Sequence, residues 1–401
     1  MKRLGWALLL LMGASPAWAA RKITVQQLKD LLVSLQQANK TDAEVAAELM
    51  QVELTEELTR STMNDVANSV PGPQSSVQMY VLEIHSAVLP PPSSDLPSTP
   101  APDAATQKAI LDKAIGYATT IYVQLPHLSA TKTTIRFEEE WPKIDSGIIQ
   151  AASQKSLFDL DQRHLGQVIR FVKSTEIPVD LEKGAEQDHL SADKAHWGEN
   201  GQVTLLGQEP DLANVVKEAQ SAGKIDWLRW ETVNGKQTAV YAFAVNKKET
   251  HYAVDYCCFR HESTDGVQQM HSSALSAHNS RLDTSTWDSR KATVPYHGEI
   301  FIDPKTGTVV RLVNLAEFKP SEDIRQEDKR IDYAPVKVGD KTFVLPVRTI
   351  VSAVTVNAKT VAQLGGERLA SSEVFTKTCN TLFVAEYSDY QLASATPLAQ
   401  K

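Results

Sequence analysis

Apolar residues in the N-terminal part of the chain recur with helical spacing, behind two repeated helix-start signals. Thr24 precedes Gln27 by three positions and Thr41 precedes Glu44 in the same way, which is the capping-box pattern. The apolar positions of the two runs are Val25, Leu28, Leu31, Leu32 and Leu35, then Val45, Leu49 and Val52. We expect a small helical unit over residues 20–88, whose apolar faces pack on one another. A groove that binds a partner protein is the alternative.

Proline marks the end of this helical unit. A third short helix is expected to begin from a cap at Thr55. Eight of the chain's 19 prolines lie between Pro71 and Pro102, where the fixed φ and the missing N–H groups exclude an inner strand. Residues 89–104 are therefore predicted to be a Pro-rich linker, which either separates the helical unit from the rest or lies along its surface.

Strand-like alternation dominates the remainder, residues 105–401. Helices are predicted only at 105–121 and 210–222. Strands are predicted at 131–137, 225–232, 237–245, 251–259, 299–302, 309–318, 333–338, 342–351 and 381–387. Consecutive strands with few helices indicate an α+β fold with a mostly antiparallel sheet, curved like a half-barrel. Residues 262–293 are rich in Ser, Thr and Asp and are expected to form a mobile insertion.

Two hairpins carry the strongest local signals of the sheet. Asn234-Gly235 joins two predicted strands and is typical of a two-residue β-turn. Residues 296–312 hold two alternating runs joined by Asp-Pro-Lys-Thr-Gly, with Ile300 and Ile302 on one face.

The first 19 residues have the form of an export signal. Lys2 and Arg3 precede an apolar run, and Ala17-Trp18-Ala19 supplies small residues at the processing positions. We expect cleavage after Ala19 and a periplasmic or extracellular product without a transmembrane segment. The formal charge is −8, or −10 without Lys2 and Arg3, which argues against a nucleic-acid partner.

An oxidising compartment would permit a disulfide bond. The chain has three cysteines, and Cys379 is expected to pair with either Cys257 or Cys258.

Common catalytic signatures are absent from the sequence. It contains no Gly-x-Ser-x-Gly elbow, no phosphate-binding loop and no dinucleotide fingerprint. Glu138 and Glu140 share a strand face and could act as paired carboxylates, but a solvated strand edge is the favoured interpretation. The catalytic residues are therefore unknown, and no cofactor is predicted.

One histidine- and cysteine-rich stretch could hold a metal ion. It contains His251, Asp255, Cys257, Cys258, His261, His271 and His278. Only Cys258 and His261 have the spacing of a ligand pair, so scattered loop histidines are the favoured interpretation. A metal site with His251, Cys258 and His261 as ligands is the alternative.

Several segments together resemble a family of uncharacterised secreted acidobacterial proteins. The matching segments are Leu125–Phe137, Val240–Val245, His251–Cys257, Tyr296–Pro304 and Leu345–Arg348. The resemblance implies export but assigns no active site. Leu345 stands where that family often has a cysteine. The Gly-x-Ile-x-Ile-Asp-x-x-Thr-Gly pattern is also similar to the curved sheet of periplasmic lipoprotein carriers, which implies an apolar concavity.

These observations favour a non-enzymatic, exported binding, carrier or envelope-associated protein. Its expected partner is an apolar or envelope ligand, with a protein partner at the helical unit as a further possibility. The alternative is a hydrolase or metal-binding protein that uses the stretch 251–278.

Overall fold

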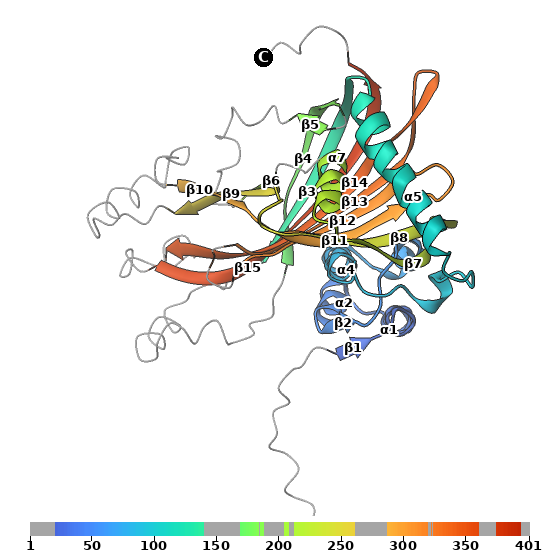
Figure 1. The fold of residues 1–401 in the computed structure, drawn as a ribbon. Helices are drawn as coiled ribbons and strands as arrows, with labels where there is room; N and C mark the ends of the chain where they lie inside the picture. Colours follow the sequence, from blue (N-terminus) through green and yellow to red (C-terminus); the bar gives the residue numbers. More distant parts are fainter. Residues whose placement is uncertain are drawn as a thin grey trace, which may run out of the picture.

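The computed structural model describes residues 21–139, 169–183, 185–187, 204–207, 212–260, 287–319, 322, 324–360 and 374–393. Within them a helical region precedes a large antiparallel sheet, which confirms the predicted α+β class (Figure 1). Residues 1–20 lie outside the described part, so the signal and its cleavage after Ala19 stay predictions.

The helical unit contains α1 (Val25–Gln37), α2 (Asp42–Leu49), α3 (Arg60–Val66) and α4 (Pro73–His85), with a parallel pair of short strands, β1 (Arg21–Ile23) and β2 (Val52–Leu54). Both predicted capping boxes, at Thr24 and Thr41, are present. The prediction that Thr55 caps the third helix is wrong, because Thr59 does so. The Thr55 amide donates to the Ile23 carbonyl instead, at 3.0 Å, and so continues the strand pair.

The apolar faces of these helices form a core of their own. Its buried members are Ile23, Val25, Leu28, Leu32, Leu35, Val45, Leu49, Val52, Leu54, Leu58, Val66, Met79 and Leu82. The stripes recognised in the sequence are thus used for internal packing, as favoured over a partner groove.

The proline-rich segment lies along the surface of the molecule. It contains a single short 3₁₀ turn, Ser93–Asp95. The Pro90 carbonyl accepts from the Glu57 amide at 2.8 Å, and the Pro100 carbonyl accepts from the Trp230 indole at 3.0 Å. The segment thus contacts both the helical unit, at Glu57, and the sheet, at Trp230 on β7.

Ten strands form one open sheet in the order β5-β4-β3-β15-β14-β13-β12-β11-β8-β7. Their bounds are β3 Leu128–Glu139, β4 Ile169–Glu182, β5 Ala185–Gln187, β7 Ile225–Val233, β8 Lys236–Val245, β11 Tyr296–Ile302, β12 Val309–Ala316, β13 Ile324–Val338, β14 Lys341–Thr360 and β15 Val374–Leu392. All neighbours pair antiparallel.

A second sheet has the order β10-β9-β6, with β6 Thr204–Gly207, β9 Ala253–Arg260 and β10 Trp287–Thr293. Residues 262–286 of the predicted insertion lie outside the described residues, whereas its last seven residues form β10 and pair with β9.

Both predicted hairpins are present. Asn234 and Gly235 have φ of 51° and 74°, the left-handed pair that a two-residue turn of this type requires. In the β11–β12 hairpin, Gly307 has φ 76°, and a Cβ there would lie 2.7 Å from the Lys113 carbonyl carbon. Glycine is therefore needed both for the turn and for the close approach of α5.

Helices cover both faces of the large sheet. The helices α5 (Ala104–Gly116), its π-helical continuation Tyr117–Ile121, and α7 (Leu212–Ser221) lie over one face, in front of the strands in Figure 1. They pack on Ile300, Ile302 and Leu312. On the opposite face, α4 packs through Val77 and Ile84 on a separate cluster that includes Phe301, Val313, Ile350, Leu382 and Val384. We call the α5/α7 side the inner face.

Candidate functional site

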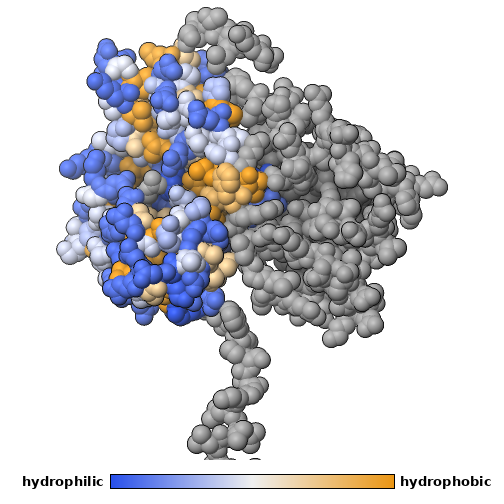
Figure 2. Space-filling view, turned by 180° about the vertical axis from the view of Figure 1, so that it is seen from behind, coloured by the Kyte–Doolittle hydropathy of each residue, from blue (hydrophilic) through white to orange (hydrophobic). Residues whose placement is uncertain are grey.

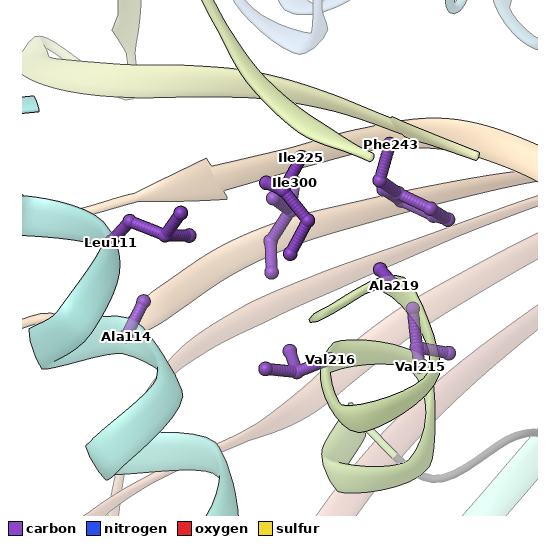
Figure 3. A pocket seen from close by; sticks show the side chains of 8 residues that line it. All are labelled: Leu111, Ala114, Val215, Val216, Ala219, Ile225, Phe243 and Ile300. Carbon is purple, nitrogen blue, oxygen red and sulfur yellow. The ribbon is translucent and has the colours of Figure 1, made fainter. Parts of the chain in front are cut away.

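The apolar part of the inner face is filled by side chains. A cavity of about 10 Å³ lies between α5, α7 and the strands β7, β8 and β11. Figure 3 shows the side chains that line it. The cavity is lined by Leu111, Ala114, Val215, Val216, Ala219, Ile225, Phe243 and Ile300. This space is about that of a single water molecule. The residues under α5 and α7 are therefore core, and they do not form an open apolar concavity.

Beyond these helices the inner face becomes polar. Side chains alternate between the two faces along each strand. On β12, Leu312 packs under α5 and α7, so Asn314 points to the same side. On β13, Ile331 packs there, so Lys329 and Glu327 share its face. Asn314 is paired directly with Lys329 in the register.

The next three strands continue this polar surface. On β14, Thr349 alternates with Ile350, which belongs to the α4 side. On β15, Thr381 alternates with Leu382 in the same way, and Thr381 is paired with Glu138 on β3. Together these residues form the inner polar cluster: Asn314, Glu327, Lys329, Thr349, Thr381, Arg136 and Glu138.

The charges of the inner polar cluster are balanced within it. Lys329 Nζ lies 3.7 Å from Glu327 Oε1 and 5.6 Å from the ring centre of Tyr252. The Tyr252 hydroxyl donates to the same Glu327 oxygen at 2.7 Å. Arg136 Nη2 lies 3.5 Å from Glu138 Oε2. Two cations thus face two carboxylates, so a ligand of the cluster needs no net charge.

Three uncharged members of the inner polar cluster have polar atoms without a hydrogen-bond partner. They are Asn314 Nδ2 and Oδ1, Thr349 Oγ1 and Thr381 Oγ1. These residues are only 1 %, 3 % and 1 % exposed, respectively. Buried polar groups in native proteins nearly always have a partner, and each one left without it costs about 1–3 kcal/mol. A molecule with its own donors and acceptors would therefore be stabilised here.

The structure corrects the interpretation of Glu138. The sequence favoured a solvated strand edge, but Glu138 is buried and β3 lies between β4 and β15. The reason is that β4, which the alternation did not predict, pairs along the other side of β3. Glu140 lies outside the described residues.

A second group of buried charges lies where the helical unit meets the sheet. Two acids come from the helical unit: Glu57, between β2 and α3, and Glu83, on α4. The sheet supplies the other members of this interface ion cluster: Arg229 and Glu231 on β7, Glu299 on β11, Arg311 on β12, Arg330 and Asp332 on β13, and Arg348 on β14. Ion pairs between these groups connect the helical unit to the sheet.

Burial perturbs the acids of the interface ion cluster. It raises the pKa of Glu57 to about 8, although Arg311 opposes the shift, and Glu231 raises that pKa further. Burial also raises the pKa of Glu299, against the effect of Arg229. For Asp332, burial would raise the pKa, but Arg330 and Arg311 outweigh it and hold the pKa well below its usual range. The perturbation of Glu57 is thus the largest upward shift among these acids.

Of the predicted metal ligands, only the His251 side chain falls among the described residues. Its Nδ1 lies 2.9 Å from Glu218 Oε1, and the Tyr296 hydroxyl donates to Glu218 Oε2 at 2.9 Å. The His251 side chain is 88 % exposed. Within the part of the chain that the structure describes, no three His, Cys, Asp or Glu side chains gather as a metal site.

The structure does not describe the side chains of the other predicted ligands or of the cysteines. Cys257 and Cys258 lie on β9, and Cys379 lies on β15 opposite Thr355, but their side chains are outside the described part, as is that of Asp255. His261, His271 and His278 lie wholly outside it. The metal site and the disulfide bond therefore stay predictions.

Sequence reasoning missed the inner polar cluster. A signal was available, because Asn314 interrupts the apolar positions of β12 on its inward face, and Lys329 does so on β13. This signal was not used, because the strand that contains Lys329 was predicted to begin only at residue 333.

Comparison with family models, with curated proteins and with solved structures finds no match to the chain. None of the helices in the described ranges is both long and apolar enough to cross a membrane.

Proposed function

We propose that this chain is an exported, non-enzymatic binding protein that holds a small amphiphilic molecule against the inner polar cluster. The observation that carries the proposal is the set of buried, unpartnered polar atoms on Asn314, Thr349 and Thr381. A ligand that supplies their hydrogen bonds would remove a free-energy cost that the ligand-free protein bears. The resemblance to secreted proteins and the signal-like N-terminus support export.

The chemistry of the cluster points to a neutral head group. Asn314 offers both a donor and an acceptor, and the two threonines offer hydroxyls. Since Lys329 and Glu327 already balance each other, as do Arg136 and Glu138, a charged ligand would gain no new counter-charge. Apolar surface adjoins the polar atoms, because Val351 lies beside Lys329 in the register and Phe383 lies beside Val351. We therefore expect a hydroxyl- or amide-bearing head with an apolar tail.

The pairing of charges also supports a binding role over catalysis. A general acid or base must be able to exchange a proton with its substrate. Here Glu327 contacts Lys329 and Tyr252, and Glu138 contacts Arg136.

The test compares the wild-type chain with Asn314→Leu, which replaces the unpartnered amide by an apolar side chain with the same number and branching of heavy atoms. The control is Asn64→Leu, the same change at an exposed position of α3. Octyl glucoside below its micelle concentration serves as the neutral probe, with an alkyl sulfate and an alkyl trimethylammonium as charged probes. We expect octyl glucoside to raise the melting temperature of the wild type and of Asn64→Leu, and not that of Asn314→Leu.

Native mass spectrometry of the freshly purified protein gives an independent result. A retained small molecule in the wild type that Asn314→Leu lacks would support the proposal. If no probe shifts the melting temperature and no molecule is retained, the unpartnered atoms bind only water and the proposal fails.

The alternative function, a hydrolase, has one observation in its favour. Buried Glu218 orients exposed His251 through Nδ1, which is how a general base is often held. A panel of esters and envelope polymers decides it: turnover by the wild type that His251→Ala lacks would favour hydrolysis, whereas equal rates would end this alternative.

A further inference from the structure

The interface ion cluster contains one more acid than base. Its five carboxyl groups are Glu57, Glu83, Glu231, Glu299 and Asp332, and its four guanidinium groups are Arg229, Arg311, Arg330 and Arg348. If every member were ionised, the buried cluster would carry one uncompensated negative charge. A buried charge without a counter-charge is strongly disfavoured, and a carboxyl group can avoid it by keeping its proton.

Two carboxyl groups in the cluster have an oxygen available for such a proton. Glu57 Oε2 and Glu231 Oε1 are buried and have no hydrogen-bond partner. Both carboxyls also approach a single atom, Arg311 Nη1, at 2.9 Å from Glu57 Oε1 and 3.9 Å from Glu231 Oε1. Glu57 thus has one oxygen on Arg311 and one that can carry a proton, with the Glu231 carboxyl group on the far side of the same arginine nitrogen.

The other four acids are better supplied with cations, whereas Glu57 accepts a single hydrogen bond, from Arg311. Glu231 Oε2 accepts from Arg229 Nε at 2.9 Å and lies 2.7 Å from Arg229 Nη2. Glu83 receives two hydrogen bonds from Arg348, at 2.9 and 3.0 Å. Glu299 receives two from Arg229, at 3.1 and 2.9 Å. Asp332 lies 2.9 Å from Arg311 and 3.3 Å from Arg330.

We propose that Glu57 keeps its proton while the helical unit is docked, and that this proton controls how firmly the helical unit is docked on the sheet. Glu57 belongs to the helical unit, and the Arg311 that it contacts belongs to β12. When hydroxide removes the proton as water, five carboxylates face four guanidinium groups at the interface, and the added charge on Glu57 lies beside Glu231. The resulting repulsion weakens docking. This inference goes beyond the proposed binding function and does not depend on it.

The direction of the pH dependence follows from the shift at Glu57. Burial raises its folded-state pKa to about 8, from an ordinary value of 4.5. An acid whose pKa is higher in the docked state takes up a proton on docking, so docking is firmest in acid. It weakens by roughly tenfold per pH unit between these two values, and above the higher one the dependence levels off. The arginines remain charged throughout this range.

The experiment is hydrogen–deuterium exchange of the full chain between pH 6 and pH 9, corrected for the intrinsic pH dependence of exchange. The peptides to follow are those of α4, which packs on the sheet, and of residues 55–59, which contain Glu57. In Glu57→Gln, the side chain is neutral and its N–H replaces the carboxyl proton. The matched control is Glu48→Gln, which makes the same change at an exposed position of α2.

We expect corrected exchange at the interface to rise by roughly 100-fold from pH 6 to pH 9 in the wild type and in Glu48→Gln, and to stay nearly constant in Glu57→Gln. The same pH dependence in Glu57→Gln as in the wild type would overturn the proposal, and so would a flat response in all three. Should Glu57→Gln not fold, infrared spectroscopy of the wild type labelled with ¹³C-glutamate still decides. A protonated carboxyl band must disappear between pH 7 and pH 9, and its absence at pH 7 refutes a protonated Glu57.

Discussion

Replacing Glu83 by Gln should destabilise the protein more than replacing its partner Arg348 by Met. Glu83 accepts two hydrogen bonds from Arg348 and also lies 3.4 Å from Arg330. All three side chains are buried. Glu83 thus pairs with two arginines, whereas Arg348 pairs mainly with one glutamate. Loss of Glu83 removes the hydrogen-bond acceptor of Arg348 and an ion-pair partner of Arg330, whereas loss of Arg348 leaves Glu83 with Arg330.

The magnitudes follow from this asymmetry. Removing one partner of a buried ion pair costs about 3–5 kcal/mol. We expect Glu83→Gln to lower the free energy of unfolding by about 5 kcal/mol, at the upper end of that range, and Arg348→Met by about 3 kcal/mol, at its lower end. The double variant should cost less than the two single changes together, by at least about 1 kcal/mol, because the residues are in contact.

Chemical denaturation at pH 7 provides the assay, with tryptophan fluorescence, to which Trp227 and Trp230 on β7 contribute, as the probe. Lys108→Gln is the control, because it breaks an exposed ion pair with Asp112 and should leave the midpoint unchanged. The reasoning would be refuted if Arg348→Met cost as much as Glu83→Gln, or if the two effects were additive.

Three further changes test other features. In the absence of ligand, Asn314→Leu should raise the free energy of unfolding by about 1 kcal/mol in denaturant titrations, because it removes unpartnered polar atoms; a loss of stability would mean that they are satisfied. Gly307→Ala should lower it by about 1–3 kcal/mol in thermal unfolding, since its φ is 76° and α5 leaves no room for a Cβ; an unchanged melting temperature would contradict this. Thr41→Ala should lower the free energy of unfolding by about 1 kcal/mol through loss of the α2 cap. Thr55→Ala should remove no helix cap, because Thr59 caps α3.

Local features of the fold could be predicted from the sequence because they depend on neighbouring residues. The caps at Thr24 and Thr41 and the turn at Asn234-Gly235 are set by side chains within four positions of one another. The prediction at Thr55 failed for the opposite reason, since its backbone is held by Ile23, which lies 32 positions away.

The candidate site required the three-dimensional pairing of distant strands. The sequence alone predicted an apolar concavity, but it could not show that Val215 and Leu111 would fill it. Nor could it show that Asn314 and Thr381 would point to the same side, because that depends on the register across β12, β13, β14 and β15. Seen from behind, the surface of the described residues mixes hydrophilic and hydrophobic areas, and one hydrophobic patch lies near the centre of the view (Figure 2).

The interface ion cluster has a consequence for the order of folding. The helical unit has its own core and is built from local contacts, which form quickly. Its charged partners, however, stand far along the chain: Arg311 is 254 positions from Glu57, and Arg348 is 265 positions from Glu83. Until β12 and β14 have formed, no arginine offsets the free-energy cost of burying Glu57 and Glu83. The first part of the polypeptide to acquire structure is therefore expected to be among the last to reach its final position.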